Sequence, residues 1–381
     1  MRRTVFPLGL LLACGGQTEK DSATLASSGT STSTSTPSEA IIDLADTLRP
    51  IRRGADLAAL GAAIVDSEGL RAIGVHGDRQ YDGDHPVTVD DPWHLGSDTK
   101  AMTATLVALM VEEGSFAWET LVTEAWPDAH EGWAGVTAED LLQHRGGATG
   151  SIPGEHPDLW ADLAANPVSR TSREAFSAAL TALEPDATVG EFTYSNAGYI
   201  LVGAMLEAVE DRAWEDLITD KLFTPLGMTR CAFGAPEGDV PWGHTPGTFE
   251  PQPVEPGPLA DNPPGLGPAG TVHCPLEDWG RFASAHLGRG SGENPLLSPA
   301  SYARMHDANG DYGHGWIVTT ESWANGTLLS HAGSNTLWLA YAHIAPNLDR
   351  AYLIVTNQFD EGALAAADEA LVELRALDGG L

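Results

Sequence analysis

The chain has 381 residues, of which 42% are hydrophobic and eleven are tryptophan, as is typical of a globular protein with one large domain or two lobes. Its formal net charge of −33 argues against nucleic-acid binding, because a protein that neutralises phosphates needs clustered Lys and Arg. No basic run is longer than the pair Arg52-Arg53. Anionic membrane surfaces are disfavoured for the same reason.

The first fourteen residues have the layout of a secretory signal. Two arginines precede an apolar run of about nine residues, far shorter than the about 20 that span a bilayer. The run ends in Leu-Leu-Ala-Cys at Cys14, which resembles the bacterial lipoprotein box. The resemblance implies removal of residues 1–13, lipidation of Cys14 and, from Gly15, anchoring in the outer membrane of the cell envelope. The alternative is an ordinary signal peptide followed by an incidental cysteine.

Residues 14–40 follow as a polar segment rich in Ser and Thr. The segment holds too little apolar surface to offset the entropy of ordering, so we expect a disordered tether. Beyond it, two cysteines remain, Cys231 and Cys274. In an exported and therefore oxidising setting they could form one disulfide, and the sequence leaves this open.

Residues 41–381 are expected to form the folded domain, with strands near both ends of the chain. Leu60–Gly77 contains two β-rich runs around the turn Asp66–Gly69, which predicts a hairpin. The late part of the chain adds strand candidates at 315–320, 326–333, 336–346 and 350–358, and then a segment with helical spacing at 361–377.

The middle of the chain is expected to be helical. A helix that begins near Ser97 and stops at Gly114 carries an apolar stripe made by Met102, Leu106, Leu109 and Met110. Further helices are predicted over residues 137–144, 172–183, 196–210 and 214–227. The stretch Gly234–Gly270 is rich in Pro and Gly and is expected to be irregular.

These elements predict an α/β (α+β) fold. One antiparallel sheet, flanked by helices, is built from residues 41–96 and 310–381, and residues 97–309 supply a mostly helical lobe with loops. A catalytic cleft is expected at the junction of the two lobes, where pockets prefer to form.

Ser97 and Lys100 are the first candidates for chemistry. Lysine is rare in this chain, which has it at positions 20, 100 and 221 alone. Positions i and i+3 share a helix face, so the Lys100 amine can reach the Ser97 hydroxyl. To act as a base near neutrality, the lysine needs its pKa lowered by about three units, which burial can achieve. The alternative is that Ser97 only caps the helix, and Asp98 is expected to do no more than complement the helix dipole.

Two further motifs carry candidate site residues. Tyr194, Ser195 and Asn196 precede an apolar helix; the tyrosine hydroxyl can relay a proton and the asparagine amide can bind a substrate amide, although Asn is also a common N-cap. The second motif is a strand that ends in His331, Ala332, Gly333 and Ser334, where a glycine lets a substrate approach the backbone.

Ser-x-x-Lys, Tyr-x-Asn and His-x-Gly follow one another in an order and spacing that resemble the serine β-lactamase and penicillin-binding family. The likeness is nearest to class C β-lactamases, D-alanyl-D-alanine carboxypeptidases and related esterases and D-peptidases, and it covers about residues 41–376. It extends to "LLQHRGG", "GPAGTVHCPLEDWGRFA" and "YGHGW".

The resemblance implies a β-lactamase-like fold and a role for each matched residue. Ser97 would be the acylated nucleophile, Lys100 its general base and Tyr194 the proton relay to the leaving group. Asn196 would bind the substrate amide. His331 and Gly333 would lie on the strand edge that aligns the acyl chain, and the amides of Ser97 and Ser334 would stabilise the oxyanion.

One position departs from the family pattern. Many β-lactamases and carboxypeptidases have lysine where this chain has His331, and a largely neutral histidine is a weaker partner for a substrate carboxylate. We therefore expect a serine hydrolase that cleaves an ester, amide or D-amino-acid peptide bond, with penicillin hydrolysis less favoured. The alternative is a non-hydrolytic envelope lipoprotein that uses the same fold to bind peptidoglycan or a partner.

Other signatures fail. There is no Gly-x-Ser-x-Gly elbow and no His-Glu-x-x-His zinc helix. The segment from Asp307 begins like a calcium loop but has Tyr312 where glycine is needed and Val318 where the bidentate glutamate belongs. We expect no metal and no cofactor, a small-molecule or peptide substrate, and no nucleic-acid partner; the oligomeric state is left open.

Overall fold

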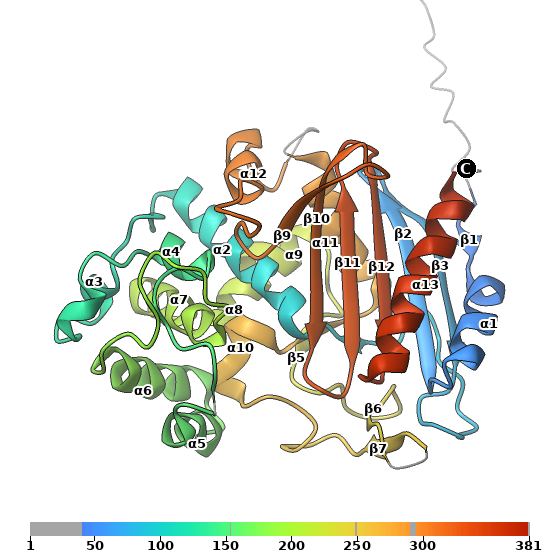
Figure 1. Cartoon of the computed structure of the whole chain (residues 1–381), viewed down its shortest axis with the longest axis horizontal. Helices are drawn as coiled ribbons and strands as arrows, with labels where there is room; N and C mark the ends of the chain where they lie inside the picture. The colour runs from blue at the N-terminus through green and yellow to red at the C-terminus, as the bar shows by residue number, and fades with distance from the viewer. Residues whose placement is uncertain (1–39, 153, 248–249, 290–294, 380–381) are drawn as a thin grey trace, which may run out of the picture. The chain divides into compact units, whose positions relative to one another are not determined.

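The computed structural model describes residues 40–152, 154–247, 250–289 and 295–379 (Figure 1). The expected signal peptide, Cys14 and the tether as far as residue 39 lie outside these residues. Within the described part of the chain, no helix is both long and apolar enough to cross a membrane.

The largest sheet has seven strands, taken from both ends of the chain. Its spatial order is β1-β3-β2-β12-β11-β10-β9. Neighbouring strands are antiparallel, as predicted, except that β1 pairs in parallel with β3 at the edge. The strands are β1 (Ile42–Asp43), β2 (Ala59–Asp66), β3 (Gly69–Gly77), β9 (Ile317–Glu321), β10 (Gly326–Ser334), β11 (Leu339–Ala345) and β12 (Arg350–Thr356).

Two smaller sheets lie in the middle of the chain. One has the order β4-β8-β5, with β4 (Trp93–His94), β5 (Ala232–Phe233) and β8 (Val272–Cys274). The other is a hairpin of β6 (Gly243–Thr245) and β7 (Gln252–Val254), so the stretch predicted to be irregular contains short strands. Cys231 and Cys274, whose pairing the sequence left open, form a disulfide.

The helices confirm the mixed α/β class. They are α1 (Ala45–Gly54), α2 (Thr99–Glu113), α3 (Val122–Ala125), α4 (Ala138–Leu142), α5 (Pro157–Ala165), α6 (Ser169–Thr181), α7 (Asn196–Glu210), α8 (Trp214–Ile218), α9 (Thr224–Leu226), α10 (Gly267–Gly270), α11 (Leu276–Gly288), α12 (Pro299–Met305) and α13 (Glu361–Asp378). Short 3₁₀-helices are η1 (Gly96–Asp98), η2 (Glu131–Trp133) and η4 (Pro264–Leu266), and η3 (Thr219–Phe223) is a π-helical turn.

Helices cover both faces of the large sheet (Figure 1). On β2, Leu60, Ala62 and Ile64 pack in one apolar cluster with α1 and α13. Ala63 and Val65, which point the other way, join the cluster that contains α2 and α11. All eight residues of β2 are buried as a result, which explains why this strand is apolar without alternation.

Helix α2 lies at the centre of the molecule. Every residue from Thr99 to Met110 is buried, so the apolar stripe expected from the sequence is only part of its contact surface. The Thr103 hydroxyl is satisfied because it donates to the carbonyl oxygen of Pro268 at 2.7 Å. The helix ends at Gly114, whose φ of 78° is a left-handed conformation that glycine adopts easily.

The helical lobe has its own buried ion pairs. The Arg173 guanidinium on α6 is fully buried and donates to Glu207 on α7 and to Glu215 on α8. Glu207 also accepts a hydrogen bond from the backbone amide of Trp214 at 2.9 Å. This network fixes α6, α7 and α8 to one another, and α10 contacts both this group and α2.

Candidate active site

Ser97 lies in η1, immediately before α2. Within the stretch Trp93–Lys100, Ser97 alone is partly exposed, and the other residues are buried. No side chain caps η1 or α2, so the capping role considered for Ser97 is absent from the structure. The hydroxyl is left free to contact Lys100.

Lys100 holds the centre of the site with three hydrogen-bond partners. Its Nζ lies 3.0 Å from Ser97 Oγ and 2.7 Å from Asn196 Oδ1. The third partner is the carbonyl oxygen of Ala269 on α10, also at 2.7 Å. The structure thus brings together residues from η1, α2, α7 and α10.

These three partners determine how the amine can act. An amide oxygen and a carbonyl oxygen only accept, so Asn196 and Ala269 each take one N–H of Lys100. A neutral amine has two N–H groups and one lone pair, and the lone pair then faces the Ser97 hydroxyl. The pKa of Lys100 falls from its ordinary value to about 7, because burial disfavours the charged form. Near neutral pH the amine is therefore able to accept the serine proton.

The surroundings of Asp98 differ from those expected for a residue at an exposed helix start. Asp98 was expected only to complement the helix dipole, but its side chain is buried, and neither carboxylate oxygen has a hydrogen-bond partner among the described residues. Burial raises the pKa of Asp98 well above its usual value, and the charge of Lys100 works in the opposite direction. The charge of Asp98 in turn raises the pKa of Lys100, against the larger effect of burial.

Asn196 is the first residue of α7, and Ser195 is the cap. The Ser195 hydroxyl accepts from the amide of Gly198 at 3.1 Å and donates to the carbonyl oxygen of Thr149 at 2.6 Å. The sequence left open that Asn196 itself was the N-cap. Because Ser195 takes that role, the Asn196 side chain is available to Lys100.

Tyr194 lies beside both residues of the Ser-x-x-Lys pair. Lys100 Nζ is 4.9 Å from the centre of the Tyr194 ring, and Tyr194 as a residue is 37% exposed. Burial of the hydroxyl end raises the pKa of Tyr194, and a hydrogen bond with the Ser97 side chain lowers it. The phenol is therefore protonated at neutral pH and in contact with the candidate nucleophile.

His331 is buried in a cluster of aromatic rings. Its Nδ1 lies 3.1 Å from the carbonyl oxygen of Ala332, and its Nε2 lies 3.2 Å from the Tyr312 hydroxyl. A carbonyl oxygen only accepts, so Nδ1 carries the hydrogen and Nε2 accepts from the tyrosine. Burial, with the charge of Lys100, lowers the pKa of His331 to about 3. The imidazole is neutral, and both of its nitrogens are used within the protein.

His144, from the "LLQHRGG" segment, supports the tyrosine motif. Its Nδ1 accepts from the backbone amide of Ser195 at 3.0 Å, and its ring lies 4.3 Å from that of Tyr194 between centres. Burial, with the charge of Lys100, lowers the pKa of His144 to about 2. A neutral imidazole here holds the loop that presents Tyr194 and Asn196.

Gly333 and Ser334 lie against the nucleophile turn. A Cβ on Gly333 would overlap the carbonyl oxygen of Leu95, so the missing side chain gives room to the protein's own backbone rather than only to a substrate. A Cβ on Gly96, whose φ is +50°, would likewise overlap the amide of Ser334. The two glycines let η1 and β10 touch, which places the backbone amide of Ser334 next to the Gly96–Ser97 turn.

The same part of β10 has an open edge. Strand β9 pairs with β10 only as far as Ser330, opposite Ile317. From His331 to Ser334, β10 pairs with β11 on its other side alone within the described sheet. An extended substrate segment could pair with this edge, because unpaired strand groups accept an added strand.

The carbonyl oxygen of Ala269 is a site group that was not predicted from the sequence. A main-chain acceptor has no residue-type signal, and α10 was expected to be part of an irregular stretch. The nearest indication was the family-like "GPAGTV" segment, which contains Ala269. No group of three or more His, Cys, Asp or Glu side chains able to hold a metal ion occurs in the described residues.

A sheet built from both chain ends, with a Ser-x-x-Lys turn packed against one of its strands, is the arrangement of proteins with the β-lactamase-like fold. A family model described as Beta-lactamase matches residues 45–377, and the chain belongs to this family. Penicillin-binding protein 4 of Amycolatopsis lactamdurans is 29% identical over 296 residues, which cover 71% of this chain and 73% of that protein.

Other relatives show the range of the family. The unguisins hydrolase ungD' of Aspergillus campestris is 26% identical over 235 residues, 58% of this chain and 42% of that protein. Among solved structures, the beta-lactamase from Sulfitobacter sp. EE-36 matches with a TM-score of 0.67 at 21% identity, over 86% of this chain and 96% of that chain. At that identity the structural likeness shows the fold, and the substrate has to be inferred from the site.

Proposed function

We propose that the protein is a serine hydrolase that works through an acyl-enzyme on Ser97. The observation that carries the proposal is the arrangement around Lys100: two acceptor oxygens use its N–H groups, so the lone pair of the neutral amine is directed at the Ser97 hydroxyl. Relatives named as hydrolase and penicillin-binding protein support the same reaction class.

In the proposed first half-reaction, Ser97 Oγ attacks the substrate carbonyl carbon while its proton moves to Lys100 Nζ. The carbonyl oxygen becomes an oxyanion, which the backbone amides of Ser97 and Ser334 stabilise; one such donor contributes about 3 kcal/mol in comparable sites. The proton then passes by way of Tyr194 to the leaving group, and the bond to that group breaks. Water attacks the acyl-enzyme in the second half-reaction and regenerates Ser97.

The substrate class follows from the neutral His331. A protonated lysine at this position would attract a substrate carboxylate, whereas the imidazole uses both nitrogens within the protein. The net charge of −33 also repels anionic substrates at long range. We therefore propose esters and D-amino-acid amides or peptides without a carboxylate near the scissile bond as preferred substrates, ahead of penicillins.

Intact-mass measurement after exposure to a p-nitrophenyl phosphonate tests the nucleophile. The expected result is one phosphonyl adduct, mapped to Ser97 and absent from Ser97→Ala. Steady hydrolysis of p-nitrophenyl esters that Ser97→Ala abolishes would support turnover. Saturable peptidoglycan binding by a protein that forms no adduct would instead favour the non-hydrolytic alternative.

We also propose that the chain is exported and anchored through a lipid on Cys14. The support is the sequence before Cys14 alone. Metabolic labelling with an alkyne fatty acid in a bacterial host should mark the wild-type protein and leave Cys14→Ala unlabelled. Equal labelling of both would contradict this proposal.

A further inference from the structure

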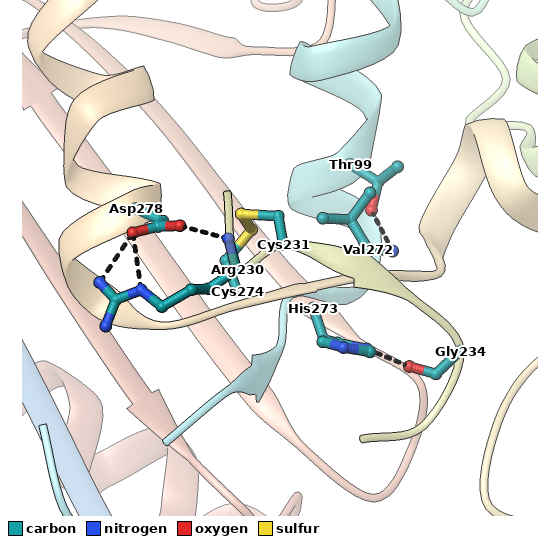
Figure 2. Close-up of a disulfide and its surroundings, with 8 residues drawn as sticks. All are labelled: Thr99, Arg230, Cys231, Gly234, Val272, His273, Cys274 and Asp278. Atoms are coloured by element: carbon teal, nitrogen blue, oxygen red, sulfur yellow. Dashed lines mark hydrogen bonds and ion pairs between the residues drawn. A yellow bond between two sulfur atoms is a disulfide. The ribbon is translucent and has the colours of Figure 1, made fainter. Parts of the chain in front are cut away.

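The Cys231–Cys274 disulfide lies at the end of β8, a short strand that contacts the start of α2 at Thr99 (Figure 2). Cys274 is the last residue of β8, the middle strand of the sheet β4-β8-β5, and it is opposite Trp93 on β4. Its partner, Cys231, immediately precedes β5. The S–S bond therefore joins the end of β8 to the start of its neighbouring strand.

Strand β8 holds the Ser97 turn from both sides. The backbone amide of Leu95 donates to the carbonyl oxygen of Val272 at 2.9 Å. The amide of Val272 in turn donates to the Thr99 hydroxyl at 3.2 Å, as Figure 2 shows. Leu95 and Thr99 lie two residues before and two residues after Ser97. One residue of β8 thus fixes both ends of the segment that presents the nucleophile.

The chain that enters β8 also holds the candidate base. Ala269, which accepts a hydrogen bond from Lys100 at 2.7 Å, is three positions before Val272. A shift of β8 would therefore move the acceptor of Lys100 together with the supports of Ser97. Both reacting groups depend on the position of the same strand.

The segment that carries Cys231 is also held to α11, the helix that follows β8 in the chain. The backbone amide of Arg230 donates to Asp278 at 2.8 Å, and its guanidinium donates to the same carboxylate at 2.8 and 3.2 Å (Figure 2). Asp278 is buried on α11, which packs on the large sheet. Because Cys231 follows Arg230, the disulfide connects β8 to a point fixed on the main core.

We propose that the Cys231–Cys274 disulfide is a positioning element of the active site, which holds β8 so that Val272 and Ala269 keep Ser97 and Lys100 in reacting geometry. This inference rests on the proposed function. The oxidised protein is the active form, and reduction slows the reaction at Ser97 without unfolding the domain. The seven-stranded sheet and the apolar cluster around α1 and α13 contain neither cysteine, and Cys274 is one of many members of the other apolar cluster, so the reduced chain keeps its core.

The test compares oxidised protein, protein treated with dithiothreitol, and the double variant Cys231→Ala/Cys274→Ala. In the treatment, the cystine takes two electrons and two protons from the dithiol, which closes to its own disulfide while two protein thiols form. The readouts are kcat and KM for a p-nitrophenyl ester, per site titrated with a p-nitrophenyl phosphonate, and near-UV circular dichroism to show that the domain is folded.

Reduction and the double variant are expected to lower kcat by about 10- to 100-fold, as misplacement of reacting groups does, with little change in KM. Dithiothreitol should have no further effect on the double variant. A lower melting temperature with unchanged kcat would overturn the proposal, because a cross-link that only stabilises the fold gives that result. An effect of dithiothreitol on the double variant equal to that on wild type would overturn it as well.

A second variant tests the support without touching the disulfide. Thr99→Val keeps the shape of the buried side chain and removes the oxygen that accepts from the amide of Val272. It should also lower kcat while the disulfide remains intact, and an unchanged kcat would count against the inference even if the double variant failed to fold. If oxidised wild type itself forms no phosphonate adduct, it is the proposed function that fails.

Discussion

The Nζ atom of Lys100 donates to the carbonyl oxygen of Ala269 across 2.7 Å, although 169 residues separate the two in the chain. Together with Asn196, this contact leaves the lone pair of the neutral amine for Ser97. The protonation state of one buried lysine is thus the variable on which the proposed reaction depends.

The reaction at Ser97 should rise with pH through about 7. Burial lowers the pKa of Lys100 to about 7, and only the deprotonated amine can take the serine proton, so kcat/KM falls as pH drops below that value. The measurement is p-nitrophenyl ester hydrolysis from pH 5 to pH 9. Lys100→Arg, which cannot deprotonate, should lose about 10²- to 10⁴-fold. A flat profile in wild type would contradict Lys100 as the base.

Asp98→Asn should move that profile toward lower pH. When the buried Asp98 carboxyl is ionised, its charge raises the pKa of Lys100, so its removal lowers that pKa and the active form persists in more acidic solution. Asp91→Asn is the matched control, because Asp91 is also a buried carboxylate but is paired with Arg79. A shift of equal size in both variants would show that Asp98 has no specific influence on Lys100.

Gly333→Ala should destabilise the protein and slow the reaction together. The added methyl group would overlap the backbone of Leu95 and Asp98 and push η1 away from β10, at a cost of about 1–3 kcal/mol. Urea unfolding and kcat measure the two effects. Gly54→Ala, at the end of α1 with nothing near its added methyl group, should leave both unchanged. Wild-type stability in Gly333→Ala would disprove the close packing.

His331→Lys should shift preference toward substrates with a carboxylate. A charged hydrogen bond is worth about 1.5–3 kcal/mol, so the ratio of kcat/KM for a penicillin to that for an uncharged ester should rise roughly tenfold or more. The ratio is the useful quantity, since any effect of the new charge on Lys100 applies to both substrates. His331→Gln, which stays neutral, should keep the wild-type ratio, and a similar ratio in all three proteins would refute the role given to His331.

Arg173→Gln should cost about 3–5 kcal/mol of unfolding free energy, because it leaves Glu207 and Glu215 without the buried cation between them. Arg170, also on α6, forms an exposed ion pair with Asp211 at the end of α7, and Arg170→Gln should change stability by about 0–1 kcal/mol. Both values come from urea titrations monitored by circular dichroism. If both variants lost the same unfolding free energy, the loss of Arg173 would not leave Glu207 and Glu215 as uncompensated buried charges, and the prediction would be wrong.

The sequence predicted the parts of the fold that have a clear local pattern. The hairpin of β2 and β3, the late strands β9 to β12 and the terminal helix lie close to their expected positions. The candidate residues Ser97, Lys100 and Asn196 also lie together. They could be selected from the sequence because each belongs to a short motif with an uncommon combination of side chains.

Other features have no local pattern to reveal them. Helix α1 contains Pro50 and was not predicted, and its place is set by packing on β2 and β3. Burial of Asp98 depends on the approach of β10, more than two hundred residues later, and so could not be inferred from a helix-start pattern. The disulfide depends in the same way on strands too short to recognise.

Pairing between the two ends of the chain also governs when the protein can form. The backbone amide of Ala59 on β2 donates to Asn357, 298 positions away. At about 5–20 residues per second, a ribosome needs roughly 15 to 60 seconds to add that length of chain. During this interval β2, whose every residue is buried in the finished fold, has no β12 to pair with. During synthesis β2 therefore has an unpaired apolar edge, which is open to association with other chains until β12, in about the last tenth of the chain, has emerged.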